Sequence, residues 1–582
     1  MSSLMFSKKK NNDSKTAETP AKAEKPTSTP SATIDIRTVA KARTWVSSLP
    51  LTDMGATTRK LFVGLTQLNK ESISPQVRID VTEVLLPYVR MVLENLDRHF
   101  LSRSFPLPER SQKIFDLKKS VLMETAGSYQ LAALEMLTKR MVSKKKLLLS
   151  IDRAIKYMSL VLVNSYEVYA KHDQSIWHDI HHLFLMACEN GLDKKTAPNK
   201  DDASGDDLSI ENQYKLINLI ALSAPNTLRQ GEVTRVYNFF KLCLRDVSIL
   251  ANSSKVKAKY AHIALLNSDE PASLMPVSDL VNSPTSRIFD LSGVINHLDQ
   301  FVSLSEKSDL GTHDKWPMLT HSLAKRLVYV LTTIRNRRYK RFPRDEKLTL
   351  AIRMADVIEM IRENDIDSFA AEVNSDVEDD NIYEALANED GVSSPWTDLD
   401  LDSLAEGKNV QLHTWHAENS SSGGYGLRQI KSESSTARVG ELVAVKDPKD
   451  EADLWQIAVI RWMDSFRDTG LKAGLEILSL HGMMVQVDEV ANREISQQLP
   501  VEGILLPTID GARKEANLIF PGFIFQAGDE LTMTLGSRQQ HITITSVDDT
   551  VGSFSYCGFD NRELEDVVEG SLESFEDVWE FL

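Results

Sequence analysis

The chain has 582 residues, of which 42% are apolar and 26% are charged, as is typical of soluble globular proteins. At roughly 150 residues per domain, this length predicts two to four domains. No apolar stretch approaches the ~18 residues needed to cross a bilayer, which argues against a membrane-spanning protein. Proteins that bind nucleic-acid polymers usually carry a net positive charge, so the formal net charge of -16 of the whole chain argues against such binding.

The negative charge is concentrated in two segments. Residues 363–406 contain fifteen Asp/Glu and no Lys/Arg, and residues 561–582 contain eight Asp/Glu and one Arg. The remaining 516 residues therefore carry a net charge of +6. The sequence predicts a mildly basic body with two acidic appendages, so the total charge alone does not exclude a phosphate-bearing ligand.

The N-terminus and the cysteines indicate the compartment. Residues 1–34 are rich in Lys, Ser, Thr and Pro and lack the apolar core of a secretory signal, so we expect a disordered tail. Cys188, Cys243 and Cys557 are far apart and form no CxxC pair, which excludes a disulfide framework and argues against structural zinc. We therefore expect a cytoplasmic protein.

Residues 35–334 are predicted to form an all-α interaction domain, because their apolar residues recur with a period of about 3.6. One helix should begin at Ser74-Pro75, and Pro87 should bend or interrupt it. Further helices are expected over 114–137, 147–169 and 319–334. The segment Tyr260–Leu266 partly alternates, so it is either a strand or an irregular link.

Three histidines in this region have two interpretations. His178, His181 and His182 are spaced i, i+3 and i+4, which would place them on one helix face as zinc requires. The same segment also reads as an amphipathic helix with histidines at its polar positions, and no second ligand cluster accompanies it. We therefore predict a structural helix and no metal site.

Residues 335–344 form a basic cluster with six Lys/Arg in ten positions. Arginine predominates, and a planar guanidinium binds phosphate bidentately, pairs with the O6/N7 edge of guanine and stacks on flat rings. Pro343 then marks the change to an alternating, strand-like stretch at 348–352. By itself, such a cluster fits a solvated surface or a general polyanion patch equally well.

A second element is the turn-like segment 419–427, which follows a strand-like stretch at 410–416. Its Asn and Ser residues can cap their own turn, and its glycines allow a positive φ, so a hairpin is expected. Short strands follow at 441–445, 454–462 and 475–477. Several short strands with turn signals indicate a small antiparallel barrel or sandwich.

Together these elements resemble the PilZ domain, the bacterial receptor module for cyclic di-GMP. Its signature is RxxxR, often RRxxR, before the first barrel strand, followed by (D/N)xSxxG at a strand turn. Arg337-Arg338-x-x-Arg341 matches the first motif and Asn419-x-Ser421-x-x-Gly424 matches the second. Residues 460–462 and 474–477 resemble the closing strands, so the resemblance covers roughly 335–480.

The spacing of the two motifs departs from the family. Here 77 residues lie between Arg341 and Asn419, whereas typical members of the family separate the two motifs by a few tens of residues. The excess coincides with the acidic stretch 363–406, which we interpret as an insertion in a barrel loop, where extra length costs little loop-closure entropy. This stretch is either a solvated loop, or its carboxylates mimic phosphate and occupy the ligand site.

The resemblance implies cyclic di-GMP as a ligand, not a catalytic cofactor, and no metal. Arginines would grip its phosphates and guanines, with Arg344 as a weaker additional candidate, and the Asn and Ser would form hydrogen bonds. The glycine would allow close backbone approach. The implied ligand-binding residues are Arg337, Arg338, Arg341, Asn419, Ser421 and Gly424.

Strand-like segments continue at 503–506, 516–520, 531–535 and 541–545, which predicts a second small β-barrel over 481–560, packed on the first. Residues 561–582 should form an acidic tail. The chain contains no P-loop, dinucleotide fingerprint, nucleophile elbow or HExxH motif, so we do not expect an enzyme.

Two functional hypotheses remain. In the first, which the resemblance implies, a cyclic di-GMP receptor couples ligand binding at the barrel to an unidentified protein partner of the helical domain and so regulates motility, pili or exopolysaccharide. In the second, the protein is a scaffold whose degenerate barrel binds no nucleotide. Binding of RNA or DNA through residues 335–344 is a weaker third interpretation.

Overall fold

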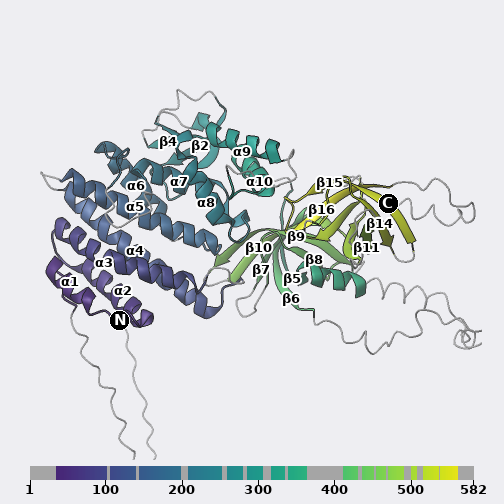
Figure 1. The fold of residues 1–582 in the computed structure, drawn as a ribbon, viewed down its shortest axis with the longest axis horizontal. Coiled ribbons are helices and arrows are strands. Elements are labelled where there is room, and N and C mark those ends of the chain that lie inside the picture. Colours follow the sequence, from purple (N-terminus) through teal and green to yellow (C-terminus); the bar gives the residue numbers. More distant parts are fainter. Residues whose placement is uncertain are drawn as a thin grey trace, which may run out of the picture.

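The computed structural model describes residues 34–561 except 101–104, 139–142, 173, 198–207, 252–257, 280–284, 306–315, 335–338, 364–409, 430–435, 451–453, 467–469, 490–499, 508–514, 523 and 536–537. Figure 1 shows a helical domain (purple to teal) followed by two β-barrels (green to yellow). This confirms the expected fold class. Among the described residues, no helix is long and apolar enough to span a bilayer.

Antiparallel helices make up most of the first domain, and their apolar faces form one large core. The N-cap of α3 is Ser74, whose hydroxyl accepts the Val77 N–H, as the Ser-Pro signal predicted. Pro87 lies inside α3, which nevertheless continues to Asp97 without interruption. The helices of this part are α1 (Val39–Ser47), α2 (Met54–Lys70), α3 (Pro75–Asp97), α4 (Glu109–Leu137), α5 (Lys144–Glu167), α6 (Ile176–Glu189), α7 (Ile210–Leu222) and α8 (Glu232–Leu242).

The all-α description of this domain is incomplete, because a four-stranded antiparallel sheet lies between α8 and α9 (Ser292–Ser305). Its order is β1 (Ser248–Leu250), β4 (Ser286–Asp290), β2 (Tyr260–Leu265) and β3 (Ser273–Pro276). Of the two interpretations of Tyr260–Leu266, the strand is correct. Helix α10 (His321–Thr332) then leads toward the first barrel.

The histidine segment forms α6, and its geometry supports the structural interpretation. His181 is buried, and its ring nitrogens lie 2.8 Å from the Tyr214 hydroxyl and 2.8 Å from the Glu270 carbonyl oxygen. Neither nitrogen is therefore available to a metal. No group of three or more potential metal ligands occurs among the described residues.

The first barrel is closed by six antiparallel strands in the order β10-β7-β6-β5-β8-β9. Inward-facing apolar residues fill it, and the same cluster continues into the helical domain, where it includes Phe100, Phe105, Leu107, Phe115, Val168 and Tyr169. The strands are β5 (Phe342–Ile352), β6 (Leu412–Ser421), β7 (Gly424–Gln429), β8 (Leu442–Lys446), β9 (Trp455–Phe466) and β10 (Gly470–Ser479).

The second barrel is also closed by six antiparallel strands, in the order β11-β12-β13-β16-β15-β14. A helix over 354–363 and the outer face of the first barrel share an apolar cluster with it, which includes Trp455, Ile519 and Phe554. The strands are β11 (Met483–Glu489), β12 (Val501–Leu506), β13 (Asn517–Pro521), β14 (Glu530–Leu535), β15 (Arg538–Asp548) and β16 (Phe554–Asn561).

One turn of the second barrel, residues 548–553, contacts both other domains. From the helical domain, Arg229 donates to the Asp549 carbonyl oxygen at 3.0 Å. From the first barrel, Gly440 accepts the Ser553 N–H at 2.7 Å. The three domains therefore meet around this turn, and Ser322 at the start of α10 also donates to the Asp549 carbonyl oxygen, at 3.0 Å.

Candidate ligand-binding site

Strand β5 brings the two sequence motifs together. Its first residues pair with β6, so that Phe342 lies opposite Ser420 and Pro343 lies opposite Asn419. Arg341, which directly precedes β5, therefore lies next to the Asn-x-Ser motif, although 77 residues lie between Arg341 and Asn419 in the sequence. Arg337 and Arg338 lie outside the described residues, as does nearly all of the acidic stretch 363–406.

The second motif forms the tight hairpin between β6 and β7, and Gly424 is essential to its geometry. Gly424 has φ of 152°, and a Cβ there would lie 1.9 Å from the Leu475 carbonyl oxygen of β10. The neighbouring Gly423 accepts the Ile477 N–H at 3.1 Å. Only glycine permits this close approach of the hairpin to β10.

A row of residues on the outer face of the barrel contains two glycines side by side. Gly426 of β7 pairs with Gly474 of β10, and their sequence neighbours Leu427 and Leu475 point into the core. The row continues to Asn419 on β6 and to Trp462 on β9. Because paired residues project to the same face, these four residues lie side by side on the outer face of the barrel.

The side chains at both ends of this row fold over the glycines. A Cβ on Gly426 would lie 2.7 Å from Asn419 Oδ1, and a Cβ on Gly474 would lie 1.9 Å from Trp462 Nε1. The amide and the indole therefore cover the two glycines. Trp462 was noted in the sequence only as part of a closing strand, because its position beside the motif depends on strand pairing.

Polar groups of the motif are available for a ligand. Asn419 Oδ1 is buried and accepts no hydrogen bond from the described residues, a state that costs about 1–3 kcal/mol unless a partner is supplied. Among the described residues, the Ser421 hydroxyl makes only a long 3.4 Å contact with the Gly424 carbonyl oxygen. Arg341 is exposed. Asn419 can therefore accept a hydrogen bond, Ser421 can donate one, and Arg341 can bind a phosphate.

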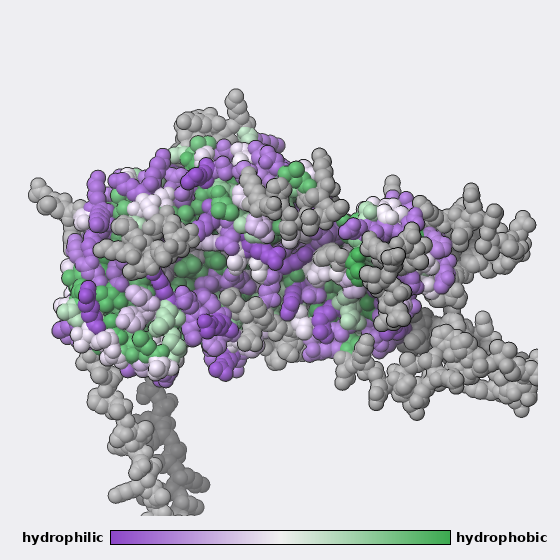
Figure 2. All heavy atoms as spheres, in the orientation of Figure 1, coloured by the Kyte–Doolittle hydropathy of each residue, from purple (hydrophilic) through white to green (hydrophobic). Residues whose placement is uncertain are grey.

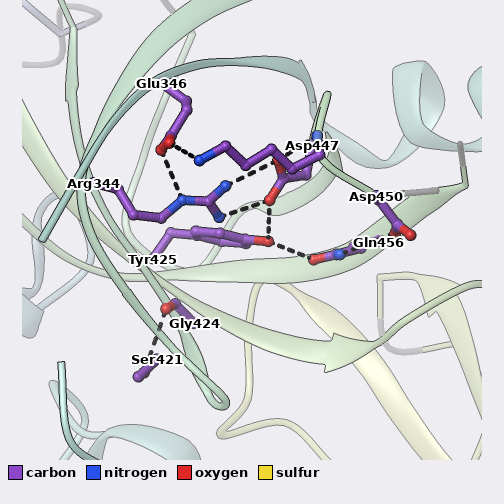
Figure 3. A network of polar contacts seen from close by, with 9 residues as sticks. Arg344, Glu346, Ser421, Gly424, Tyr425, Asp447, Asp450 and Gln456 are labelled. Atoms are coloured by element: carbon purple, nitrogen blue, oxygen red, sulfur yellow. Dashed lines mark hydrogen bonds and ion pairs between the residues drawn. The ribbon is translucent and has the colours of Figure 1, made fainter. Parts of the chain in front are cut away.

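Arg344, the weaker arginine candidate, is held in a different network (Figure 3). Its guanidinium donates to Asp447 at 2.7 Å and to Glu346 at 2.8 Å, and it lies over the Tyr425 ring. Tyr425 in turn donates to Asp447 at 3.2 Å. Because its donors are already engaged, Arg344 stabilises the barrel and is not available to a ligand.

The electrostatics of this network agree with a structural role. Burial acts to raise the pKa of Asp447, but hydrogen bonds from Arg344 and from the Lys449 backbone N–H hold it below the ordinary value. Burial, together with the charge of Asp447, raises the pKa of Tyr425 to about 12. Asp447 is therefore ionised and Tyr425 is neutral at physiological pH.

A closed antiparallel barrel whose β6–β7 hairpin lies beside the start of its first strand, β5, defines a PilZ-domain protein. Three models of one family match in order: the cyclic-di-GMP receptor FimW N-terminal domain at 40–256, its middle PilZ domain at 362–483, and the FimW C-terminal β-barrel domain at 488–561. Together they cover most of the chain, which belongs to this PilZ-containing family.

A curated relative supports the same assignment. The cyclic-di-GMP receptor FimW of Pseudomonas aeruginosa is 24% identical over 561 residues, which cover 90% of each chain. No solved structure matches this chain significantly. The PilZ model begins at residue 362, after β5, although the structure shows that β5 closes the barrel and directly follows the arginine motif.

Proposed function

We propose that this protein is a cyclic di-GMP receptor and not an enzyme. The observation that carries the proposal is the pairing of β5 with β6, which places Arg341 beside Asn419 and Ser421. The matching family models and the relative that is named as a cyclic-di-GMP receptor support it. Residues 335–480 would form the ligand-binding domain, with Arg337 and Arg338 completing the site.

The residues suit the two phosphates and two guanines of this ligand. Arg341 binds a phosphate or a guanine edge, for which a guanidinium is well shaped. Asn419 Oδ1, which lacks a donor, accepts from a guanine N–H, and Ser421 donates to a phosphate or guanine oxygen. The indole of Trp462 provides a flat surface on which a base can stack.

The position of the arginine motif provides a route for the signal. The motif links α10 of the helical domain to β5 of the barrel, so ligand binding there alters the connection between the two domains. Figure 2 shows apolar residues at the surface of the helical domain around α1 and α2, where Leu51 and Val63 are exposed. This surface would bind a cytoplasmic protein partner that controls pili, motility or exopolysaccharide.

Isothermal titration calorimetry with the full chain tests the receptor function. We expect Arg341→Ala and Asn419→Ala each to weaken cyclic di-GMP binding about tenfold or more, since each removes a charged or buried hydrogen bond. Arg43→Ala, which removes an exposed arginine of α1, is the matched control and should bind as the wild type does. Wild-type protein that shows no binding at roughly 100 μM ligand would refute the proposal and favour the scaffold.

A further inference from the structure

A pocket of about 630 Å³ lies where the three domains meet. Helix α10 and residues 227–229 form its helical side, strands β9 and β10 form its barrel side, and the turn 548–553 closes it. The residues on which the argument depends are Arg229, Lys325, Arg326, Tyr329, Arg461 and Glu476.

The lining of this pocket carries an excess of positive charge. Four of its side chains are cationic and only Glu476 is acidic. Burial lowers the pKa of Arg229 and the charges of Arg326 and Arg461 lower it further, although the nearby carboxylates of Glu232, which pairs with Arg326, and Asp549 act in the opposite direction. Guanidiniums that repel one another in a partly buried space favour the binding of an anion.

Arg461 connects this pocket to the second motif. A β-bulge occurs opposite Gly474 and Leu475, where Arg461 is the extra residue of β9. Its guanidinium donates to Glu476 and, at 2.5 Å, to the Val551 carbonyl oxygen. Glu476 is the register partner of Gly424, so the pocket begins directly beside the Asn-x-Ser-x-x-Gly hairpin.

Aromatic side chains are exposed on both sides of the arginine motif. Tyr329, which lines the pocket, is 60% exposed, and Phe342, at the start of β5, is 57% exposed. Tyr339 is also exposed, and its ring lies against Gly423 of the hairpin. Flat rings beside cationic groups suit a ligand that combines bases with phosphates.

We propose that this pocket is the outer half of the ligand site and receives one phosphodiester group together with the base beside it. The inference rests on the proposed receptor function. Lys325 contacts the phosphate, Tyr329 stacks on the base, and Arg461 exchanges Glu476 for the phosphate. The helical domain then contacts the ligand directly. Because Arg461 also donates to the Val551 carbonyl oxygen, its release from the Glu476 carboxylate connects ligand binding to the turn 548–553.

Calorimetry with cyclic di-GMP tests the proposal with three substitutions, of which two should weaken binding and one should strengthen it. Lys325→Ala and Tyr329→Ala should each weaken binding about fivefold or more, because they remove a charged contact and a stacking surface. Glu476→Gln should tighten binding about threefold, because it removes a negative charge that repels the phosphate and it frees Arg461. All three side chains are largely exposed, so thermal unfolding should change little.

The controls separate this inference from the receptor function. If the wild type binds and Arg341→Ala weakens binding, but neither Lys325→Ala nor Tyr329→Ala has an effect, only this inference is overturned. If the wild type does not bind cyclic di-GMP, both the receptor function and this inference are refuted. If 5′-GMP binds the wild type, loses binding in Lys325→Ala and does not compete with cyclic di-GMP, the pocket holds a separate mononucleotide and the shared-ligand proposal is wrong.

Discussion

Gly426 offers a way to displace one proposed ligand-binding group, the Asn419 amide, without removing it. Its Cα lies beneath the Asn419 amide, and an added Cβ would meet Asn419 Oδ1 at 2.7 Å and Nδ2 at 2.8 Å. Both contacts are with the end of a side chain that can rotate, not with backbone. Gly426→Ala is therefore expected to push the Asn419 amide away while the strand pairing persists.

The size of the effect follows from these distances. Ordinary contacts begin near 3.4 Å, so the amide must shift by roughly 0.7 Å. A ligand hydrogen bond of about 2.9 Å would then stretch to about 3.6 Å, at which it is lost. The net loss of about 0.5–1.5 kcal/mol corresponds to a dissociation constant raised up to about tenfold.

Calorimetry and thermal denaturation together test this reasoning. The unfolding midpoint should change little, because alanine lowers the entropy of the unfolded chain and offsets part of the local strain. Gly127→Ala on α4 is the matched control, since its Cβ would make only an ordinary 3.7 Å contact with Asn69. A Gly426→Ala protein that binds cyclic di-GMP as tightly as the wild type would refute the assigned role of Asn419.

Three further predictions concern stability. Asp447→Asn should lower the free energy of unfolding at pH 7 by about 1–3 kcal/mol. Because the pKa of Asp447 is depressed in the folded protein, this loss should shrink as the pH falls below the unfolded pKa of about 3.9. Chemical denaturation at pH 7 and at a pH below that value measures the difference. Asp269→Ala should lower the melting temperature, because its carboxylate caps α6 by accepting three backbone N–H groups, at about 0.5–2 kcal/mol. Arg229→Ala should speed hydrogen exchange in the turn 548–553 and leave exchange in α3 unchanged; equal exchange in the turn would contradict the junction described above.

Local patterns predicted much of this fold because they depend on near neighbours in sequence. The Ser74-Pro75 signal located the start of α3, and alternating segments located strands of both barrels. The sheet of the helical domain was mostly missed, because a strand as short as Ser248–Leu250 carries too few residues to show alternation. Its stability depends on pairing with β4, which the sequence does not display.

The candidate site was predictable only in part for the same reason. The motifs predict Asn419 and Gly424 as candidates, since residue type and spacing are local. The roles of Trp462 and Arg344 depend on register: pairing brings the indole onto Gly474, and Asp447, 103 residues beyond Arg344, engages its guanidinium. Side-chain partners so far apart in sequence become apparent only in the folded barrel.

Parallel titrations of the full chain with cyclic di-GMP and cyclic di-AMP test the central claim most directly. Arginine pairs with the O6/N7 edge of guanine, whereas adenine presents an amino group in place of that O6 acceptor. We therefore predict binding of cyclic di-GMP, with cyclic di-AMP at least about tenfold weaker. Equal affinity for the two ligands, or no binding of cyclic di-GMP at roughly 100 μM, would contradict the account.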